Sequence, residues 1–190
     1  MKDWQQHRFD VASQFIRGGE GLEIAPWENP MRLPCCTIRY VDIDPEHFTQ
    51  PDMVADNAEV LATVADESLD FILCCHVLEH CANPIRAIEV HLQKIRPGGH
   101  LFYVLPDADF TTCDKGRQIT PWEHVLADYE NQVPPVKGDE GHLHVWNLAA
   151  YAEFFACCRR LFYYGFEIEH FEAYLDNMED IVVLRKAAGR

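Results

Sequence analysis

Four polar side chains in the second half of the chain have the types and spacing of a proton-transfer site. His124 and Asp128 are four residues apart, so on a helix they share one face and the carboxylate could orient the imidazole. His142 and His144 are two residues apart, so in an extended segment they point the same way. Histidine and carboxylate groups commonly remove a proton from a reacting hydroxyl. The sequence therefore predicts a catalytic group made of His124, Asp128, His142 and His144.

The same four residues permit two other interpretations. His124 and Asp128 could be only an exposed helical pair, and His142 and His144 could fix a turn. Imidazole and carboxylate groups are also ligands of divalent metals, although nothing in their spacing requires an ion. The eight cysteines include no Cys-x-x-Cys pair, which is the spacing typical of structural zinc sites. We therefore expect no metal.

A second group of polar residues follows the predicted strands of a parallel sheet. In open α/β sheets, ligands bind outside the carboxyl ends of the strands. Asp42 ends one predicted strand, and an acid at this place can bind both hydroxyls of a ribose. Asp56 and Asn57 end the next strand, where one carboxylate and one backbone N–H could read an adenine edge. Taken in this order, they describe an adenosine pocket.

The sheet edge depends on a strand–helix–strand unit at residues 69–105. The run LDFILCC (69–75) is continuously apolar, as in a strand that is covered on both faces. Asn83 caps a helix that has Pro84 at its first position, and Pro97-Gly98-Gly99 is expected to end it. The run HLFYVLP (100–106) is the next strand, which completes a right-handed parallel unit.

Other segments surround this unit. Thr120, with Pro121 and Glu123, forms a predicted capping box at the start of a helix, and Asn147 caps another. The polar loop 131–141 looks like a lid or rim of the site. The remaining predicted elements are a helix at 4–17, strands at 21–25, 38–43 and 53–57, and a terminal hairpin at 166–175 and 180–186.

Composition limits the possible partners. The formal net charge is −15, which disfavours nucleic acids and anionic membranes because both bind clustered Lys and Arg. No apolar run approaches the roughly 18–20 residues of a membrane helix. The first residues lack the order of a signal peptide, so we expect a cytoplasmic protein. A length of 190 residues suits one domain, and a small molecule is the expected partner.

The stretch from Asp66 to Asp107, DESLDFILCCHVLEHCANPIRAIEVHLQKIRPGGHLFYVLPD, resembles the class I S-adenosylmethionine-dependent methyltransferases. The similarity extends over nearly the whole chain. The segment TPWEHVLADYE and the later HLHVW look like a bacterial subgroup whose members often accompany glycosyltransferases in surface-polysaccharide synthesis. The resemblance implies an α/β, Rossmann-like sheet that is mostly parallel, with an antiparallel C-terminal hairpin strand.

The resemblance also implies a cofactor, S-adenosylmethionine, with S-adenosylhomocysteine as the product. Matching residues place Glu23, Ile24 and Ala25 against the methionine end, Asp42 and Ile43 at the ribose, Asp56 and Asn57 at adenine, and Cys75 and His76 near the sulfonium. One departure stands out. The glycine-rich turn of the family reads Ala25-Pro26-Trp27-Glu28-Asn29-Pro30 in this chain.

We therefore expect a single methyltransferase domain over residues 1–190. It would comprise an N-terminal helix (1–19), a core sheet (20–107), an acceptor-side insertion or lid (about 108–146), and a C-terminal helix and hairpin (147–190). The expected reaction is O-methylation of a small-molecule or glycan-precursor acceptor. Two alternatives stay open: a non-catalytic domain that binds the cofactor, its product or a partner, and an enzyme that methylates nitrogen or a protein. The sequence does not indicate an oligomeric state.

Overall fold

The computed structural model describes residues 3–44, 52–138 and 141–188. Within these ranges, seven strands form one sheet in the order β3-β2-β1-β4-β5-β7-β6. All neighbouring pairs from β3 to β5 are parallel, whereas β7 is antiparallel to both β5 and β6. The mostly parallel sheet with an antiparallel C-terminal hairpin is thereby confirmed. The strands are β1 (Gly19–Ile24), β2 (Cys36–Asp42), β3 (Val54–Ala55), β4 (Leu69–Cys75), β5 (Ile95–Pro106), β6 (Phe166–Tyr174) and β7 (Glu179–Lys186).

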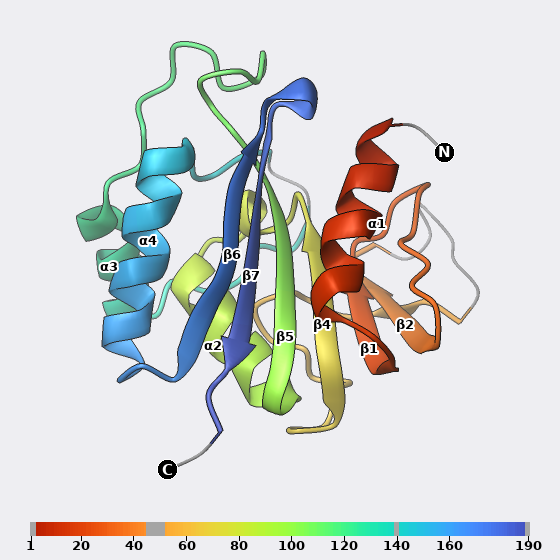
Figure 1. Ribbon diagram of the computed structural model, residues 1–190. Helices are drawn as coiled ribbons and strands as arrows, with labels where there is room; N and C mark the ends of the chain where they lie inside the picture. Colours follow the sequence, from red (N-terminus) through yellow and green to blue (C-terminus); the bar gives the residue numbers. More distant parts are fainter. Residues whose placement is uncertain (1–2, 45–51, 139–140, 189–190) are drawn as a thin grey trace.

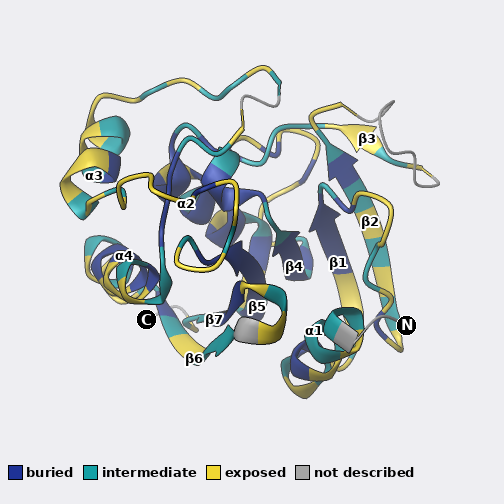
Figure 2. Cartoon of the chain, turned by 90° about the horizontal axis from the view of Figure 1, so that it is seen from above, coloured by how far each residue is buried: buried dark blue, intermediate teal, exposed yellow. Residues whose placement is uncertain are grey.

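Helices cover both faces of the sheet (Figure 1). Helix α1 (Asp3–Phe15) packs on one face against alternate residues of the central strands, such as Phe71 and Leu73. Helices α2 (Pro84–Lys94), α3 (Trp122–Glu130) and α4 (Leu148–Leu161) belong to the core on the other face, which includes Ile72 and Cys74. The central strands are buried from both sides, as the continuous apolar run of β4 predicts (Figure 2). None of the helices in the described ranges is long and apolar enough to cross a membrane.

The unit β4–α2–β5 has the predicted architecture but a different internal boundary. The side chain of Asn83 accepts a hydrogen bond from the Arg86 backbone N–H, which confirms the predicted cap. Helix α2 ends at Lys94, and Ile95 already pairs with Leu69 before the register shifts across residues 96–99. The prediction that Pro97-Gly98-Gly99 ends the helix is therefore wrong. A Cβ on Gly99 would lie 2.6 Å from the Asp70 carbonyl oxygen, so this glycine allows a close approach of the two strands.

The start of α3 also differs from the prediction. Pro121 takes the cap position and no side chain caps the helix, so the predicted capping box at Thr120 does not form. The hydroxyl of Thr120 instead accepts a hydrogen bond from the Val145 backbone N–H at 2.9 Å, and the Thr120 N–H donates to the Val145 carbonyl. Thr120 thus joins the two ends of the segment that contains α3. The cap predicted at Asn147 is confirmed, because its side chain accepts from Ala150 N.

A buried histidine lies between α2 and the sheet. His91 is fully buried, with its Nε2 2.9 Å from the Ala58 carbonyl oxygen and its Nδ1 2.8 Å from the Tyr103 hydroxyl. A carbonyl only accepts, so Nε2 carries the proton, and the tyrosine hydroxyl donates to Nδ1. Burial lowers the pKa of His91 to about 4, although the hydrogen bond to Ala58 opposes this change.

This low pKa predicts a loss of stability in acid. Between about pH 6.5 and pH 4 the unfolded chain protonates His91 and the folded chain does not, so the free energy of unfolding falls as the pH falls. Urea titrations measure the free energy of unfolding of His91→Gln and of the unmodified protein. The difference between the two proteins should be smaller at pH 4.5 than at pH 7, by roughly 2 kcal/mol. The partly exposed His100, changed to Gln, serves as the control. The prediction would be contradicted if the free energies of unfolding of His91→Gln and of the unmodified protein changed with pH in parallel.

Candidate active site

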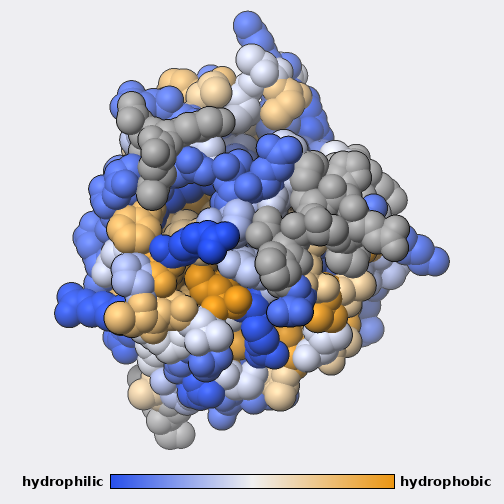
Figure 3. Space-filling view, turned by 90° about the vertical axis from the view of Figure 1, so that its right-hand side faces the viewer, coloured by the Kyte–Doolittle hydropathy of each residue, from blue (hydrophilic) through white to orange (hydrophobic). Residues whose placement is uncertain are grey.

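One cavity, of about 1210 Å³, opens at the carboxyl ends of β1, β2 and β4. It contains all nine residues predicted to bind the cofactor: Glu23, Ile24, Ala25, Asp42, Ile43, Asp56, Asn57, Cys75 and His76. The strand order reverses between β1 and β4, so the cavity lies where open α/β sheets bind ligands. Figure 3 shows the surface of the molecule that lies on the right in Figure 1. Apolar side chains gather there between hydrophilic ones.

The turn after β1 is closed by a buried acid. Glu23 is buried, and both of its carboxylate oxygens lie within hydrogen-bond distance of the Met31 backbone N–H, at 2.9 and 3.1 Å. Burial raises the pKa of Glu23 to about 8, against the opposing effects of Met31 and Arg8. Ala25 and Trp27 both have φ of 49°, a left-handed conformation that glycine usually adopts. The turn thus forms left-handed conformations without glycine, at some cost in backbone strain.

This strain predicts that the folded protein is more stable with glycine at position 25 than with the native alanine. A left-handed backbone costs a residue with a Cβ about 1 kcal/mol, which exceeds the entropic penalty of glycine in the unfolded chain. Ala25→Gly should therefore raise the free energy of unfolding by about 0.5 kcal/mol and the melting temperature by roughly 1–2 °C. Ala150→Gly, inside α4, should do the opposite. A melting temperature lowered by Ala25→Gly would show that the turn is not strained at this residue.

The ends of β1, β2 and β3 are held together by backbone hydrogen bonds. Ala25 N donates to the Val41 carbonyl, and Asp56 N donates to the Asp42 carbonyl at 3.0 Å. The Asp42 carboxylate accepts from the Asp44 backbone N–H at 2.9 Å. Asp42 and the exposed Ile43 therefore occupy a fixed position in the cavity wall, next to the turn after β1.

Asp56 and Asn57 line the cavity, but their side chains have structural partners. The Asp56 carboxylate accepts from the backbone N–H groups of Asn57, Ala62 and Thr63 and from the Thr63 hydroxyl. Burial alone would raise the pKa of Asp56, but these hydrogen bonds lower it. The Asn57 amide donates to the Val136 carbonyl at 3.0 Å, which connects the cavity to the rim loop 131–141, apart from residues 139–140, which lie outside the described residues. To bind the adenine edge, the Asp56 carboxylate would have to lose one of its four hydrogen bonds.

The end of β4 places a thiol and a histidine at the cavity. Burial raises the pKa of Cys75 to about 12, so its thiol is neutral. His76 Nε2 lies 2.7 Å from Glu179 Oε1, and its Nδ1 lies 3.5 Å from Glu79 Oε1. Burial alone would lower the pKa of His76, but the two carboxylates outweigh it and raise the pKa to about 9. At neutral pH the imidazole is therefore a cation in the cavity wall.

Sequence reasoning missed the groups that hold this histidine. Glu179 is buried and also binds Arg8 of α1, so one carboxylate connects the first helix, β4 and the last strand. Arg8 also lies over the Trp4 ring, 4.4 Å from its centre. The spacing of Trp4 and Arg8 on one helical face was a usable signal. Nothing in the sequence near Glu179 indicates its partners.

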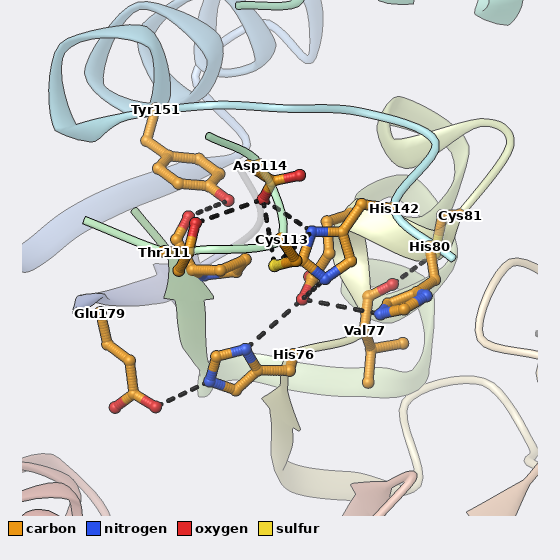
Figure 4. A network of polar contacts seen from close by, with 12 residues as sticks. His76, Val77, His80, Cys81, Thr111, Cys113, Asp114, His142, Tyr151 and Glu179 are labelled. Carbon is orange, nitrogen blue, oxygen red and sulfur yellow. Dashed lines mark hydrogen bonds and ion pairs between the residues drawn. The ribbon is translucent and has the colours of Figure 1, made fainter. Parts of the chain in front are cut away.

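The predicted catalytic residues divide into two groups. His142 lines the cavity beside His80, with ring centres 4.9 Å apart. Its Nδ1 lies 2.8 Å from the carboxylate of the buried Asp114, which Arg117 also contacts at 2.8 Å (Figure 4). Asp114 was not predicted as a site residue. Because it fixes the imidazole of His142, Asp114 belongs to the site.

His124, Asp128 and His144 form the second group, which does not line the cavity. His124 Nε2 lies 3.4 Å from Asp128 Oδ2, as the helical spacing predicts, and the His124 side chain is 57% exposed. The buried His144 stacks on Trp146 and meets the His124 ring edge-on. The prediction that His142 and His144 point the same way is wrong, because the backbone bends at residues 143–144 and sends the two rings to different groups.

Comparison with known proteins agrees with this architecture. A family model described as a methyltransferase domain matches residues 11–157, and no curated protein matches the chain. An S-adenosylmethionine-dependent methyltransferase from Methanosarcina mazei has a similar structure, with a TM-score of 0.61, 14% identity, and 94% of this chain and 98% of that chain covered.

Two further structures show the same fold. The [4+2]-cyclase SpnF has a TM-score of 0.62 and 15% identity, with 97% of this chain and 81% of that chain covered. The CurJ carbon methyltransferase has a TM-score of 0.61 and 14% identity, with 97% of this chain and 54% of that chain covered. At these identities the likeness shows the fold, whereas the family model covers most of the chain. The chain therefore belongs to the methyltransferase-domain family, and S-adenosylmethionine is its expected cofactor.

Proposed function

We propose that the protein transfers a methyl group from S-adenosylmethionine to a hydroxyl oxygen of a small-molecule or glycan-precursor acceptor. One observation carries this proposal: a single cavity contains the predicted cofactor residues together with His80 and His142. Its volume of about 1210 Å³ exceeds the roughly 300–1,000 Å³ of a pocket for one drug-sized ligand. The cavity thus has room for the cofactor and a small acceptor.

The residues present fit the cofactor. When bound, S-adenosylmethionine supplies an electrophilic methyl group on a positively charged sulfur. The walls carry Asp42 for the ribose hydroxyls and the closed turn at Glu23 for the methionine end. The neutral thiol of Cys75 and the backbone of β4 form an uncharged part of the floor, next to the His76 cation. Asp56 and Asn57 support the adenine side mainly by shaping the backbone there.

The acceptor end lies at His142. Methyl transfer to a hydroxyl forms a carbon–oxygen bond, returns the carbon–sulfur electron pair to sulfur, and releases the hydroxyl proton. Holding the oxygen in line with the methyl group supplies much of the rate, and removal of the proton adds to it. Asp114 accepts the Nδ1 proton of His142, so Nε2 is the atom that can activate the hydroxyl. We place activation here rather than at His124, Asp128 and His144, because the cavity does not include them.

The cofactor half of the proposal is tested first. S-adenosylhomocysteine should stabilise the folded protein, because it binds the folded state alone. We expect a concentration-dependent rise in melting temperature, and an absence of any rise at millimolar ligand would refute the proposal. A panel of sugar nucleotides, phenols and amines is then incubated with S-adenosylmethionine and analysed by mass spectrometry. Methylated hydroxyl compounds are expected. Products from amines alone would favour transfer to nitrogen.

One observation favours a second candidate, a domain that binds the cofactor or its product without transferring methyl. The turn after β1 has Ala25 and Trp27 in left-handed conformations where glycines would let a ligand approach without a Cβ. The similar structure described as a [4+2]-cyclase also indicates that this fold can support other chemistry. Binding of S-adenosylhomocysteine, with no methylated product from any acceptor in the panel, would support this candidate.

A further inference from the structure

Glu79 is a buried carboxylate without a hydrogen-bond partner in the described part of the chain. It lies in the short helix η1 (Leu78–His80), is 0% exposed, and neither of its side-chain oxygens is hydrogen-bonded. A buried carboxylate is costly unless a positive group or several donors compensate it. Its surroundings should therefore contain, or be built to receive, a positive charge.

Three histidines face this carboxylate: two from the same short stretch as Glu79 and one from a distant segment. Oε1 of Glu79 lies 3.5 Å from His76 Nδ1, 3.9 Å from His80 Nε2 and 3.9 Å from His142 Nε2. The His76 cation is shared between Glu79 and Glu179, so it compensates the charge of Glu79 only in part. One ligand atom from each of Glu79, His80 and His142 lies within 4.8 Å of the others. Figure 4 shows His80 and His142 converging on the same space.

The hydrogen bonds around His142 define which of its atoms faces Glu79. Nδ1 donates to Asp114, so the neutral ring presents the Nε2 lone pair to the carboxylate. Arg117 contacts Asp114 and also donates to the His142 carbonyl at 2.7 Å, which holds both partners in place. A lone pair facing a carboxylate is unfavourable unless a proton or a metal cation lies between them. Metal-binding histidines characteristically have a carboxylate on the second ring nitrogen.

We propose that Glu79, His80 and His142 bind one divalent transition-metal ion at the wall of the cavity. Two imidazoles and one carboxylate are the ligand set of manganese, iron, cobalt or zinc ions, whereas magnesium and calcium favour oxygen ligands throughout. Metal–ligand bonds of about 2.1 Å place neighbouring ligand atoms roughly 3.0–3.4 Å apart. The side chains therefore need to move inward by less than an ångström or so from the observed 3.9 Å separations. This proposal replaces the expectation of no metal.

The position of the ion would deepen the proposed function, on which this step rests. His80 and His142 both line the cavity, so the remaining coordination positions face the acceptor. A hydroxyl bound to a divalent ion loses its proton more readily than a free one. The hydroxyl proton then passes to water in the cavity, and His142 activates the acceptor as a metal ligand instead of accepting the proton itself. The acceptor class is a hydroxyl compound whose oxygen can coordinate the ion.

The site is tested by metal binding without cofactor or acceptor. Chelator-stripped protein is titrated with Mn²⁺, followed by electron paramagnetic resonance, and with Co²⁺ and Zn²⁺, followed by calorimetry. We expect one ion per chain. Glu79→Gln and His142→Ala should abolish this binding, and Asp114→Asn should weaken it by roughly 10- to 100-fold. Since Glu79→Gln changes a buried group, His142→Ala, in a segment near the surface, keeps the test independent of folding.

Two control variants locate the ion. His100→Ala lies outside the cavity and should bind as the unmodified protein does. Asp128→Asn alters the separate group of His124, Asp128 and His144, which could also hold an ion, and it too should leave binding unchanged. Loss of binding in Asp128→Asn but not in His142→Ala would overturn the proposal, and so would the absence of binding at millimolar ion.

Failure of the metal proposal can be distinguished from failure of the proposed function. S-adenosylhomocysteine should raise the melting temperature with or without the ion, because the predicted cofactor residues and the metal ligands are different side chains. Stripped protein should transfer methyl slowly and recover on addition of the ion. If stripped protein transfers at the full rate while His142→Ala does not, the metal proposal fails and His142 acts as the base. If neither protein transfers methyl to any acceptor, the proposed function fails, whereas ion binding remains measurable.

Discussion

Asp42→Ala is expected to weaken S-adenosylhomocysteine binding by roughly 30- to 1,000-fold. The Asp42 carboxylate stands at the end of β2, in the wall of the cavity, where it can accept hydrogen bonds from both ribose hydroxyls. Each hydrogen bond to a charged acceptor contributes about 1.5–3 kcal/mol, and water recovers part of the loss. A total of about 2–4 kcal/mol corresponds to the expected range. Calorimetric titration of both proteins measures it.

The controls for Asp42 separate recognition from folding. Asp42 accepts a hydrogen bond from the Asp44 backbone, so the variant's circular dichroism and urea unfolding must be compared with those of the unmodified protein. Asp44→Ala removes an acid from the same loop and should reduce affinity by less than tenfold. If Asp42→Ala binds within about threefold of the unmodified protein, or if Asp44→Ala has the larger effect, the ribose contact lies elsewhere.

His142→Ala is expected to lower kcat by roughly 10²- to 10⁴-fold, the usual contribution of a residue that activates a nucleophile. The affinity for S-adenosylhomocysteine should stay nearly constant, because His142 is not one of the predicted cofactor residues. Asp114→Asn should lower kcat less, since the imidazole remains while the carboxylate that orients it is lost. Single-turnover kinetics with an acceptor found in the screen separate the transfer step from product release.

His124→Ala is the matched comparison for this result. His124 is a histidine of the same predicted acceptor-side region, but it is exposed and lies outside the cavity. Its removal should change kcat by less than about threefold. A larger effect from His124→Ala than from His142→Ala would return the catalytic role to the group of His124, Asp128 and His144.

Local signals predicted most of the fold. The apolar run of β4 reveals a strand buried on both faces, and Asn83-Pro84 reveals the start of α2, because these depend on residues that are neighbours in the chain. The errors occur where a distant partner competes. Thr120 pairs with Val145 instead of capping α3, and the contact of Ile95 with Leu69 ends α2 early. Neither partner can be identified from local sequence.

The same distinction holds for the site. The predicted cofactor residues meet at one cavity because parallel strands bring their carboxyl ends to one edge. Glu79 could be read only as a helical residue, since one of its contacts comes from a segment more than sixty residues away, the one that carries His142. Asp114 and Glu179 were missed for the same reason: their importance lies in the histidines that they hold.

The contact between Arg8 and Glu179 joins residues separated by 171 positions in the sequence. Strand β7 begins at Glu179 and follows all the other strands in the chain, so it is synthesised after them. It nevertheless lies between β5 and β6 in the sheet. During translation, the cavity floor at His76 would lack its partner carboxylate until this last strand emerges from the ribosome. Ligand-binding competence in a nascent chain should therefore appear late and abruptly, as the final hairpin pairs with β5.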